Sequence, residues 1–298
     1  MHWWMLLACL ASPAYADPKP KLPKEPKVDI ATLTNDPVLG KADQINGIET
    51  TGMVAFTFDD GPNPTTTPAV IDALEKYKIP ATFFIVSQRL LGKHGEKSRE
   101  VLAREIAGGF LLGSHSYSHP NLKGADAKVL GREVDQAIRI LAKEANRTIG
   151  VFRAPYGALG NTSRGWLKKR GLTEAYWSVD TLDWQAHDSE RLRKKVLRMI
   201  IAQHGGVVLM HDVKPITAKI IANVLDDLEA YNCKQLAEKA EPIWPVSIHY
   251  FLRDKKQARA VPDDVKKVTE AYRAALPTRC GKRAPAPAPD PVKPPPKK

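Results

Sequence analysis

The sequence predicts an α/β fold built around a parallel sheet with crossover helices, either open or closed into a barrel. Short apolar runs alternate about seven times with amphipathic stretches of helical spacing, which is the pattern of such a fold. Of the 298 residues, 43% are hydrophobic. The chain therefore has enough apolar side chains for a sizeable core, in one large domain or two small ones.

Seven apolar runs are the predicted strands. They cover residues 53–58, 81–86, 110–113, 150–152, 174–179, 207–210 and 246–251. Amphipathic stretches between them are the predicted helices. They begin at residue 67 and end before Pro80, and then cover 99–107, 127–145, 162–169, 189–203 and 217–231, with an added helix over 261–276.

Local signals support two of these helices. Thr67-Pro68 begins the first, because proline favours the first helical turn, and Pro80 ends it. Over 127–145, apolar residues recur at helical spacing after Asp126, a typical N-cap. Each stretch therefore has one apolar face for packing against the sheet.

Composition divides the chain into five parts. We expect a signal peptide at 1–16, a Pro- and Lys-rich extension at 17–50, the main domain at 51–255, a C-terminal helical extension at 256–281, and a disordered Pro-rich tail at 282–298. Proline and lysine dominate 17–27, and Ala-Pro repeats begin at 284. Such segments are expected to be extended.

The N-terminus has features of an export signal. An apolar stretch over 3–10 is followed by a small-x-small pattern ending at Ala16, although no Lys or Arg precedes it. Cys9, in a loose lipoprotein cleavage box, offers lipid anchoring as the alternative. The stretch is too short to span a bilayer. We expect an exported protein, periplasmic or secreted, with no stable transmembrane anchor.

The formal net charge of +12 raises the question of a nucleic-acid partner. About half of this excess lies in the tails: four Lys against two acids in 17–27, and five Lys or Arg against one Asp in 282–298. The rest shows no dense basic stripe with interleaved aromatics, so no nucleic-acid partner is expected. An anionic wall polymer or membrane surface fits better.

Without Cys9, the mature chain keeps two cysteines, Cys233 and Cys280. In an exported protein, an even pair predicts a disulfide, here one that ties the C-terminal region to the domain. Two free thiols are the alternative, because sequence does not fix the geometry of the pair.

Two adjacent carboxylates, Asp59 and Asp60, stand where the first strand breaks into Gly61-Pro62. At the last residues of a strand, both side chains can reach one site as the backbone turns. Such a pair can divide its work, one acid binding a metal and the other moving protons. An ordinary Asp-Gly turn is the alternative.

Two imidazoles, His115 and His119, follow the third strand in Ser-rich sequence that stops at Pro120. At this spacing they can converge on one cation, in a loop rather than a helix because proline disfavours helix at the preceding residue. A pair of solvated or packed histidines is the alternative.

Three further strand ends carry polar side chains. Arg153 ends the fourth strand and could hold a neighbouring carboxylate ionised. Asp183 and Trp184 follow the fifth strand, and His211 follows the sixth. Each has an ordinary alternative as a surface, capping or loop residue. Five such segments after successive strands would nevertheless gather at one concave face.

In this order and form, the segments TFDDGP, HSYSH, RAPYG, DTLDW and LMH resemble the five motifs of NodB-homology polysaccharide deacetylases, carbohydrate esterase family four. The resemblance runs from about residue 53 to residue 212. It implies a distorted (β/α) barrel of about seven strands, with a strand near Ile248 closing it. It also implies a divalent metal ion, usually zinc, held by Asp60, His115 and His119. This donor set suits zinc or another first-row ion.

The same resemblance implies roles for the remaining motif residues. Asp59 would be the general base, held ionised by Arg153. His211, oriented and kept protonated by Asp183, would give a proton to the departing amine. The residues implied for substrate binding are Tyr156, Trp184 and Leu209.

These roles predict a metal-dependent enzyme that removes acetyl groups from N-acetylglucosamine residues of a wall polysaccharide. Peptidoglycan is the expected polymer, because a basic exported protein meets the anionic wall first. Chitin, chitooligosaccharides and acetylxylan stay open, since the motifs describe the acetyl group. A non-catalytic wall-binding module is an alternative of another class, and a glycosidase fits poorly because adjacent acids do not flank a glycosidic bond. We expect a monomer.

Overall fold

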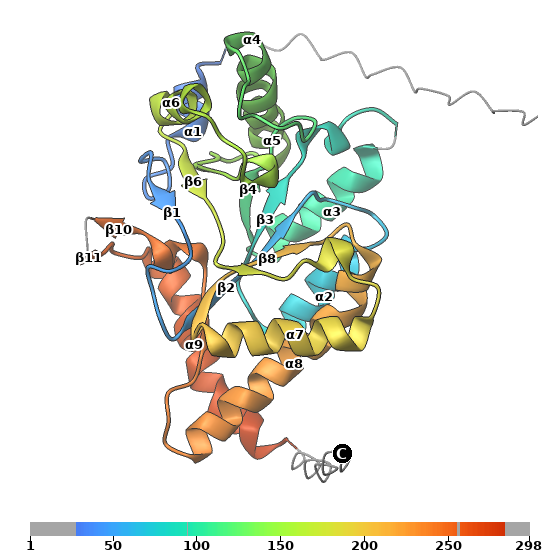
Figure 1. Cartoon of the computed structure of the whole chain (residues 1–298), viewed down its shortest axis with the longest axis vertical. Helices are drawn as coiled ribbons and strands as arrows, with labels where there is room; N and C mark the ends of the chain where they lie inside the picture. Colours follow the sequence, from blue (N-terminus) through green and yellow to red (C-terminus); the bar gives the residue numbers. More distant parts are fainter. Residues whose placement is uncertain (1–27, 94, 255–256, 284–298) are drawn as a thin grey trace, which may run out of the picture.

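The computed structural model of the protein describes residues 28–93, 95–254 and 257–283 (Figure 1). The predicted signal peptide, Cys9, the Pro- and Lys-rich segment 17–27 and the tail from residue 284 lie outside these residues. Within the described ranges, no helix has the length and apolar character that crossing a membrane requires.

One parallel sheet of nine strands forms the centre of the described chain and curls into a half-barrel. Its order is β1-β6-β5-β4-β3-β2-β8-β7, and β9 pairs with β2 off this path. The predicted α/β architecture is thereby confirmed. The strands are β1 (Gln44–Ile45), β2 (Met53–Asp59), β3 (Ala81–Ile85), β4 (Leu111–Ser114), β5 (Val151–Phe152), β6 (Thr173–Ala175), β7 (Val179–Asp180), β8 (Gly205–His211) and β9 (Trp244–Pro245).

The predicted strand 174–179 is two strands. β6 pairs with β5 and β1, whereas β7 pairs with β8 at the other end of the sheet order. Between them, the Tyr176 N–H donates to the Ile45 carbonyl (2.8 Å) and the Ser178 N–H to the Val207 carbonyl (3.0 Å). This crossing segment bridges the two edges of the half-barrel.

The predicted strand 246–251 is wrong, and no strand near Ile248 closes the barrel. β9 stops at Pro245, and a 3₁₀ turn, η5 (Ile248–Phe251), follows. The Ser247 hydroxyl lies 2.8 Å from Nδ1 of His249, a local side-chain contact of the kind that favours turns. Ile248 and Phe251 are both buried. Their spacing of three matches a 3₁₀ turn and not the alternation of a strand.

Helices cover the outside of the sheet (Figure 1). The stretch predicted as one helix over 127–145 is α4, a π-helical segment η2 and α5. Short 3₁₀ turns follow several strands. The helices and turns are α1 (Ile30–Thr34), α2 (Thr67–Tyr77), η1 (Ser87–Leu90), α3 (Gly95–Ala107), α4 (Ala127–Leu130), η2 (Gly131–Gln136), α5 (Ala137–Ala145), η3 (Pro155–Gly157), α6 (Asn161–Lys169), η4 (Asp183–Gln185), α7 (Ser189–Ala202), α8 (Pro215–Ala237) and α9 (Asp263–Gly281), with a short hairpin of β10 (Arg253–Asp254) and β11 (Gln257–Ala258) before α9.

Strand alternation divides the core into two clusters. In β2, Val54, Phe56 and Phe58 face the helices, while Ala55 belongs to the cluster inside the half-barrel. Asp59 follows the parity of Ala55 and is 3% exposed. Period-two alternation therefore turns this carboxylate to the inner face of the curled sheet.

The C-terminal helix is tied to the body of the protein. A disulfide joins Cys233 of α8 to Cys280 of α9. Arg279 of α9 also pairs with Glu229 of α8 (2.6 Å). At the other end of the described chain, α1 and β1 come from the region predicted as an N-terminal extension, and β1 pairs with β6.

Candidate active site

The polar segments that follow the strands meet at one end of the half-barrel. β2 ends at Asp59 and β8 at His211, and these residues are direct partners in the ladder. Arg153 follows β5, and its N–H donates to the Ser114 carbonyl at the end of β4 (3.0 Å). The carboxyl ends of parallel strands are where barrels collect functional side chains.

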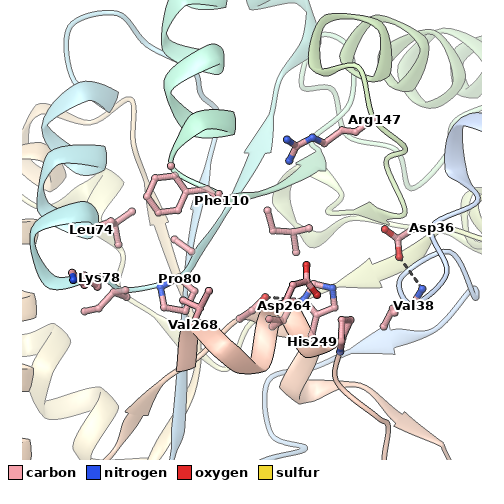
Figure 2. Close-up of a pocket in the computed structure, with 18 of the residues that line it drawn as sticks. Asp36, Val38, Leu74, Lys78, Pro80, Phe110, Arg147, His249, Asp264 and Val268 are labelled. Atoms are coloured by element: carbon pink, nitrogen blue, oxygen red, sulfur yellow. Dashed lines mark hydrogen bonds between the residues drawn. The ribbon is translucent and has the colours of Figure 1, made fainter. Parts of the chain in front are cut away.

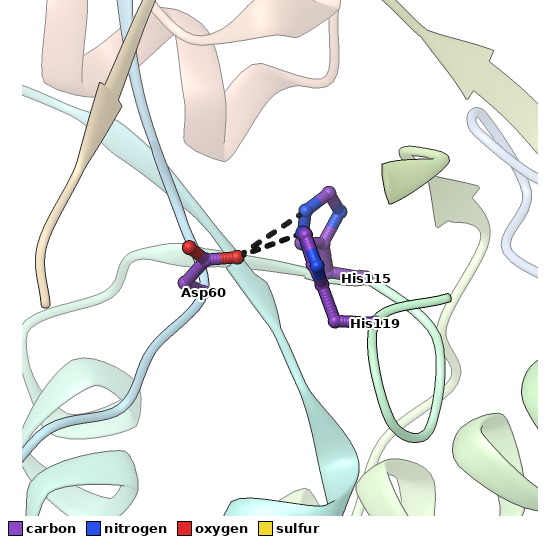
Figure 3. A group of neighbouring side chains, drawn as sticks. All are labelled: Asp60, His115 and His119. Carbon is purple, nitrogen blue, oxygen red and sulfur yellow. Dashed lines mark ion pairs between the residues drawn. The ribbon is translucent and has the colours of Figure 1, made fainter. Parts of the chain in front are cut away.

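Asp60, His115 and His119 lie close enough together to hold a metal ion, and theirs is the one cluster of that kind among the described residues (Figure 3). We call this group the metal triad. One ligand atom from each residue lies within 4.8 Å of the others. Asp60 Oδ1 is 3.6 Å from His115 Nε2 and 3.1 Å from His119 Nε2. Asp60 and His119 have φ of 77° and 63°, in the left-handed region that non-glycine residues seldom adopt outside functional turns.

Hydrogen bonding prepares the triad for a cation. His115 Nδ1 lies 2.8 Å from the Arg153 carbonyl oxygen, which can only accept, so Nδ1 is the donor and Nε2 is the ring nitrogen that faces the triad. Burial, helped by the neighbouring His115, lowers the pKa of His119 and favours its neutral form. Asp60 Oδ1 is buried without a hydrogen-bond partner. An orphaned carboxylate oxygen costs free energy that a bound cation would recover.

The donor set therefore fits a divalent first-row ion. Two neutral imidazoles and one carboxylate are a usual set for catalytic zinc, which takes three protein ligands and keeps an open position. Asp59 lies just beside the triad, with Oδ2 3.7 Å from His115 Nε2.

Arg153 fixes the Asp59 carboxylate. Its Nη1 donates to Asp59 Oδ1 (2.8 Å) and to Thr57 Oγ1 (2.7 Å), and its other nitrogens donate to the carbonyls of Ala175 and Tyr176. The guanidinium is fully buried over the Phe84 ring. Burial lowers the pKa of Arg153, and the Asp59 charge opposes this effect. A buried guanidinium thus fixes the orientation of the Asp59 carboxylate.

His211 is held by Asp183 on the neighbouring loop. Asp183 Oδ1 is 2.7 Å from His211 Nδ1, and its Oδ2 accepts from the His211 N–H (2.7 Å) and Thr217 Oγ1 (2.5 Å). Burial opposes a charge on His211, but Asp183, with Asp59 and Asp60, outweighs it and raises the pKa of His211 to about 9. Burial likewise works against the charge on Asp183, yet its hydrogen bonds leave the pKa lowered. His211 is therefore an imidazolium at neutral pH.

The three residues predicted to bind substrate have different surroundings. Tyr156 is 69% exposed, has φ of 60° and contacts the His119 ring edge-on at 4.8 Å between centroids. Trp184, beside Asp183 on η4, is 52% exposed. Leu209 is buried within β8. Two aromatic faces are therefore available to a sugar at the rim, while Leu209 can only form a wall.

Sequence reasoning missed Glu133, a fully buried acid of the π-helical segment. Its carboxylate accepts from the Ser118 N–H (2.8 Å) and hydroxyl (2.9 Å), and its carbonyl accepts from the Tyr117 N–H (3.0 Å). Glu133 thus holds the loop between the two histidines. The sequence did contain a signal for it. Glu133 lies three residues after Leu130, on the apolar stripe of its helix, where a buried acid requires a polar partner.

Asp212, next to His211, is a second buried acid that no motif assigned. Its Oδ2 accepts from the Thr67 hydroxyl. Burial raises the pKa of Asp212 to about 7, with Asp60 acting in the same direction and Arg89 against it. The Gly61 backbone packs directly against this carboxylate, so no side chain fits there. Asp212 thereby braces the turn after Asp60.

A separate cavity of about 610 Å³ lies at the opposite end, where β3 and β4 begin (Figure 2). Mostly apolar residues such as Pro80 and Phe110 line it, with His249 and Ser247 in its wall. Burial lowers the pKa of His249, so its imidazole is neutral. We assign the Ser247–His249 contact to the η5 turn, and the chemistry stays with the metal triad.

Comparison with known proteins agrees with this geometry. A family model described as polysaccharide deacetylase matches residues 46–175. The peptidoglycan-N-acetylglucosamine deacetylase PgdA of Listeria monocytogenes is 31% identical over 216 residues, 72% of this chain and 44% of that protein. The chitooligosaccharide deacetylase of Sinorhizobium fredii is 33% identical over 165 residues, 54% of this chain and 73% of that protein. The solved Bc1960 peptidoglycan N-acetylglucosamine deacetylase is similar with a TM-score of 0.58 at 25% identity, covering 73% of this chain and 95% of that one.

Fold and site define an α/β half-barrel protein with a metal triad beside a buried acid–arginine pair. The chain belongs to the polysaccharide deacetylase family. It spans less than half the length of the Listeria relative.

Proposed function

We propose that the protein is an exported, metal-dependent deacetylase that hydrolyses the acetamide of N-acetylglucosamine residues in peptidoglycan and releases acetate. The observation that supports this most directly is the metal triad beside Asp59, which Arg153 holds, and the charged His211. Relatives named for peptidoglycan deacetylation support the polymer. We further propose that residues 51–255 are the catalytic domain, preceded by a cleaved signal peptide, and that the protein acts as a monomer.

The metal triad would hold zinc, which when bound polarises a carbonyl and makes water more acidic. Asp59 would accept the proton of the attacking water, and Arg153 orients its carboxylate for this role. The Tyr156 N–H would donate to the oxygen on which negative charge develops. Tyr156 adopts a left-handed backbone conformation with φ of 60°.

His211 would complete the reaction on the side of the leaving group. Departure of an amide nitrogen requires a proton, and His211 is a charged acid at neutral pH because Asp183 faces its Nδ1. Trp184 and Leu209 would enclose the acetyl methyl. Asp59 and His211 end neighbouring strands, so base and acid can act on one carbonyl.

The direct test is acetate release from purified peptidoglycan and from chitotetraose, each measured with and without a chelator. We expect release that stops on chelation and returns with added zinc. Binding to peptidoglycan without metal-sensitive release would instead indicate a wall-binding module.

A second candidate is a chitooligosaccharide deacetylase, favoured by the similarity to the Sinorhizobium enzyme. The site geometry described so far serves either polymer, since it addresses the acetamide. Release from chitotetraose alone would favour this candidate.

A further inference from the structure

A pocket of about 450 Å³ opens beside the metal triad. Its lining residues are Asp60, Val86, Gln88, Arg89, Ser118 and His119. The volume is in the range of small-ligand sites. Asp60 and His119 belong to the triad, and Arg89 is the one Lys or Arg in the lining. None of the five motifs includes Arg89.

The backbone fixes Arg89 relative to the metal triad. Arg89 lies on η1, directly after β3. The Val86 N–H donates to the Gly61 carbonyl (3.0 Å), next to Asp60, and the Ser87 N–H donates to the Ser116 carbonyl (3.1 Å), next to His115. Two segments that carry metal ligands are therefore bonded to the turn that carries Arg89, and the turn keeps its place beside the site.

The Arg89 guanidinium is available to a ligand. Its side chain is exposed, and within the described ranges it has no hydrogen bond or ion pair with another side chain. Its charge acts at longer range on buried Asp212, whose Oδ2 is already bonded to Thr67. By contrast, the guanidinium of Arg153 already donates hydrogen bonds to Asp59 and to main-chain carbonyls. A free guanidinium on a fixed turn is suited to bind a carboxylate with two parallel hydrogen bonds.

We propose that Arg89 forms an anion subsite that binds a carboxylate of the glycan next to the reacting N-acetylglucosamine. The subsite makes the enzyme select an acidic glycan over a neutral one. This inference rests on the proposed deacetylase function and deepens it. Peptidoglycan carries carboxylates, either in the lactyl group on every second sugar or on its peptides. Chitin carries no carboxylate.

The test compares three tetrasaccharides of equal length. The first alternates N-acetylglucosamine with N-acetylmuramic acid and has free lactyl carboxylates, the second is its methyl ester, and the third is chitotetraose. For Arg89→Gln, we expect the ratio of kcat/KM for the acid to that for the ester to fall roughly tenfold, because a hydrogen bond to a charged group contributes about 1.5 kcal/mol or more. Arg89→Lys should recover part of this ratio.

Arg147→Gln is the matched control, since Arg147 is also exposed but lines the cavity at the opposite end of the half-barrel. For this variant, the ratio of kcat/KM for the acid to that for the ester should equal the wild-type ratio. An equal loss on acid, ester and chitotetraose in Arg89→Gln, or no loss at all, would overturn the anion subsite. Wild-type protein inactive on all three sugars would overturn the proposed function instead. In that case, calorimetry can still test the subsite, by measuring how tightly the acid and the ester bind to the wild type and to Arg89→Gln.

Discussion

At the scale of single residues, Asp59 and Asp60 are chain neighbours with different surroundings. Asp59 is the last residue of β2 and turns inward onto Arg153. Asp60 adopts a left-handed conformation and turns toward His115 and His119. One peptide bond thus separates a carboxylate fixed by a guanidinium from a carboxylate facing two imidazoles. The geometry supports the division into base and metal ligand.

Asp59→Asn should abolish most acetate release and leave zinc bound. The amide is nearly isosteric but is a poor base, and general base catalysis typically contributes about 10²–10⁴-fold in rate. Zinc content after dialysis and acetate release, measured on the same samples, check this. A variant without zinc would mean that the two aspartates are assigned backwards.

His119→Ala provides the opposite case. It removes one of three ligands and should weaken zinc binding strongly, together with activity, because a two-ligand site holds zinc poorly. Competition titration with a zinc chelator measures the affinity. Unchanged affinity would remove His119 from the metal triad.

Asp183 should set the alkaline limit of activity. His211 acts as an acid only while protonated, and its pKa is raised from 6.5 to about 9. Activity should therefore fall as pH rises through about 9. The pair of His211 and Asp183 also stabilises the fold. This contribution is complete below pH 6.5 and is lost as the pH rises through about 9. In Asp183→Asn, His211 stays buried, which lowers its pKa, and loses the carboxylate charge that raises it. The alkaline limit of activity should therefore move to lower pH. A pH profile of kcat/KM checks this, and an unmoved alkaline limb would contradict the assignment.

At the residue level, the sequence predicts the gathering of polar side chains that follow apolar strands, while their roles stay predictions. Asp59, His115, Arg153 and His211 all lie at strand ends that meet in space. Sequence reasoning could not find Arg89, because this arginine is distinguished by the backbone bonds that hold its turn and by having no side-chain hydrogen bond or ion pair within the described ranges. Both depend on contacts between segments far apart in the sequence.

At the scale of secondary structure elements, η2 links a helix to the metal triad. α4, η2 and α5 form one stretch, and its π-helical part carries Glu133. π segments recur at functional sites. Here, the side chain and carbonyl of Glu133 accept from Ser118 and Tyr117, inside the loop between His115 and His119. The helix thereby orders the loop that carries His115 and His119.

Glu133→Ala should weaken zinc binding by roughly 10–100-fold, the usual effect of losing a residue that orients metal ligands. Affinity is measured by chelator competition, and Co²⁺ absorption reports the coordination geometry. Glu133→Gln should recover part of the affinity, because the amide oxygen still accepts.

Glu105→Gln is the matched control for Glu133. Glu105 is also a fully buried helical glutamate whose pKa burial raises, and within the described residues neither of its carboxyl oxygens has a hydrogen-bond partner. Its zinc affinity should equal that of the wild type. If Glu133→Ala lowered only the melting temperature of the metal-free protein, Glu133 would support the fold and not the site.

Prediction of elements succeeded for amphipathic helices and long strands, and failed where neighbours decide. The pairing of β6 with β5 and of β7 with β8 depends on which edge the chain reaches after residue 175, and a local pattern does not record that choice. Residues 246–251 contain apolar side chains in a β-like order, but Pro245 and the Ser247–His249 contact favour a turn.

At the scale of the whole molecule, the metal triad and the helix α9 lie apart. The metal triad lies where the strands end, whereas α9 packs on α8 and its residue Val268 lines the opposite cavity. The parallel sheet makes this separation predictable, because its carboxyl ends all lie on one side. The docking of α9 was not predictable beyond the cysteine pair, since its contacts depend on the finished surface of α8.

The disulfide should contribute stability and not activity. Cys233 and Cys280 are 47 residues apart, and a cross-link of this size restricts the unfolded chain enough to contribute about 2–4 kcal/mol. The double variant Cys233→Ser/Cys280→Ser should therefore lose that much unfolding free energy in urea. Its kcat on N-acetylglucosamine oligomers, well below the melting temperature, should match the wild type, because α8 and α9 supply no residue of the metal triad.

Wild-type protein unfolded in reductant is the control, and its unfolding free energy should approach that of the variant. Equal unfolding free energies for oxidised wild type and variant would show that the contacts of Arg279 with Glu229 suffice to hold α9.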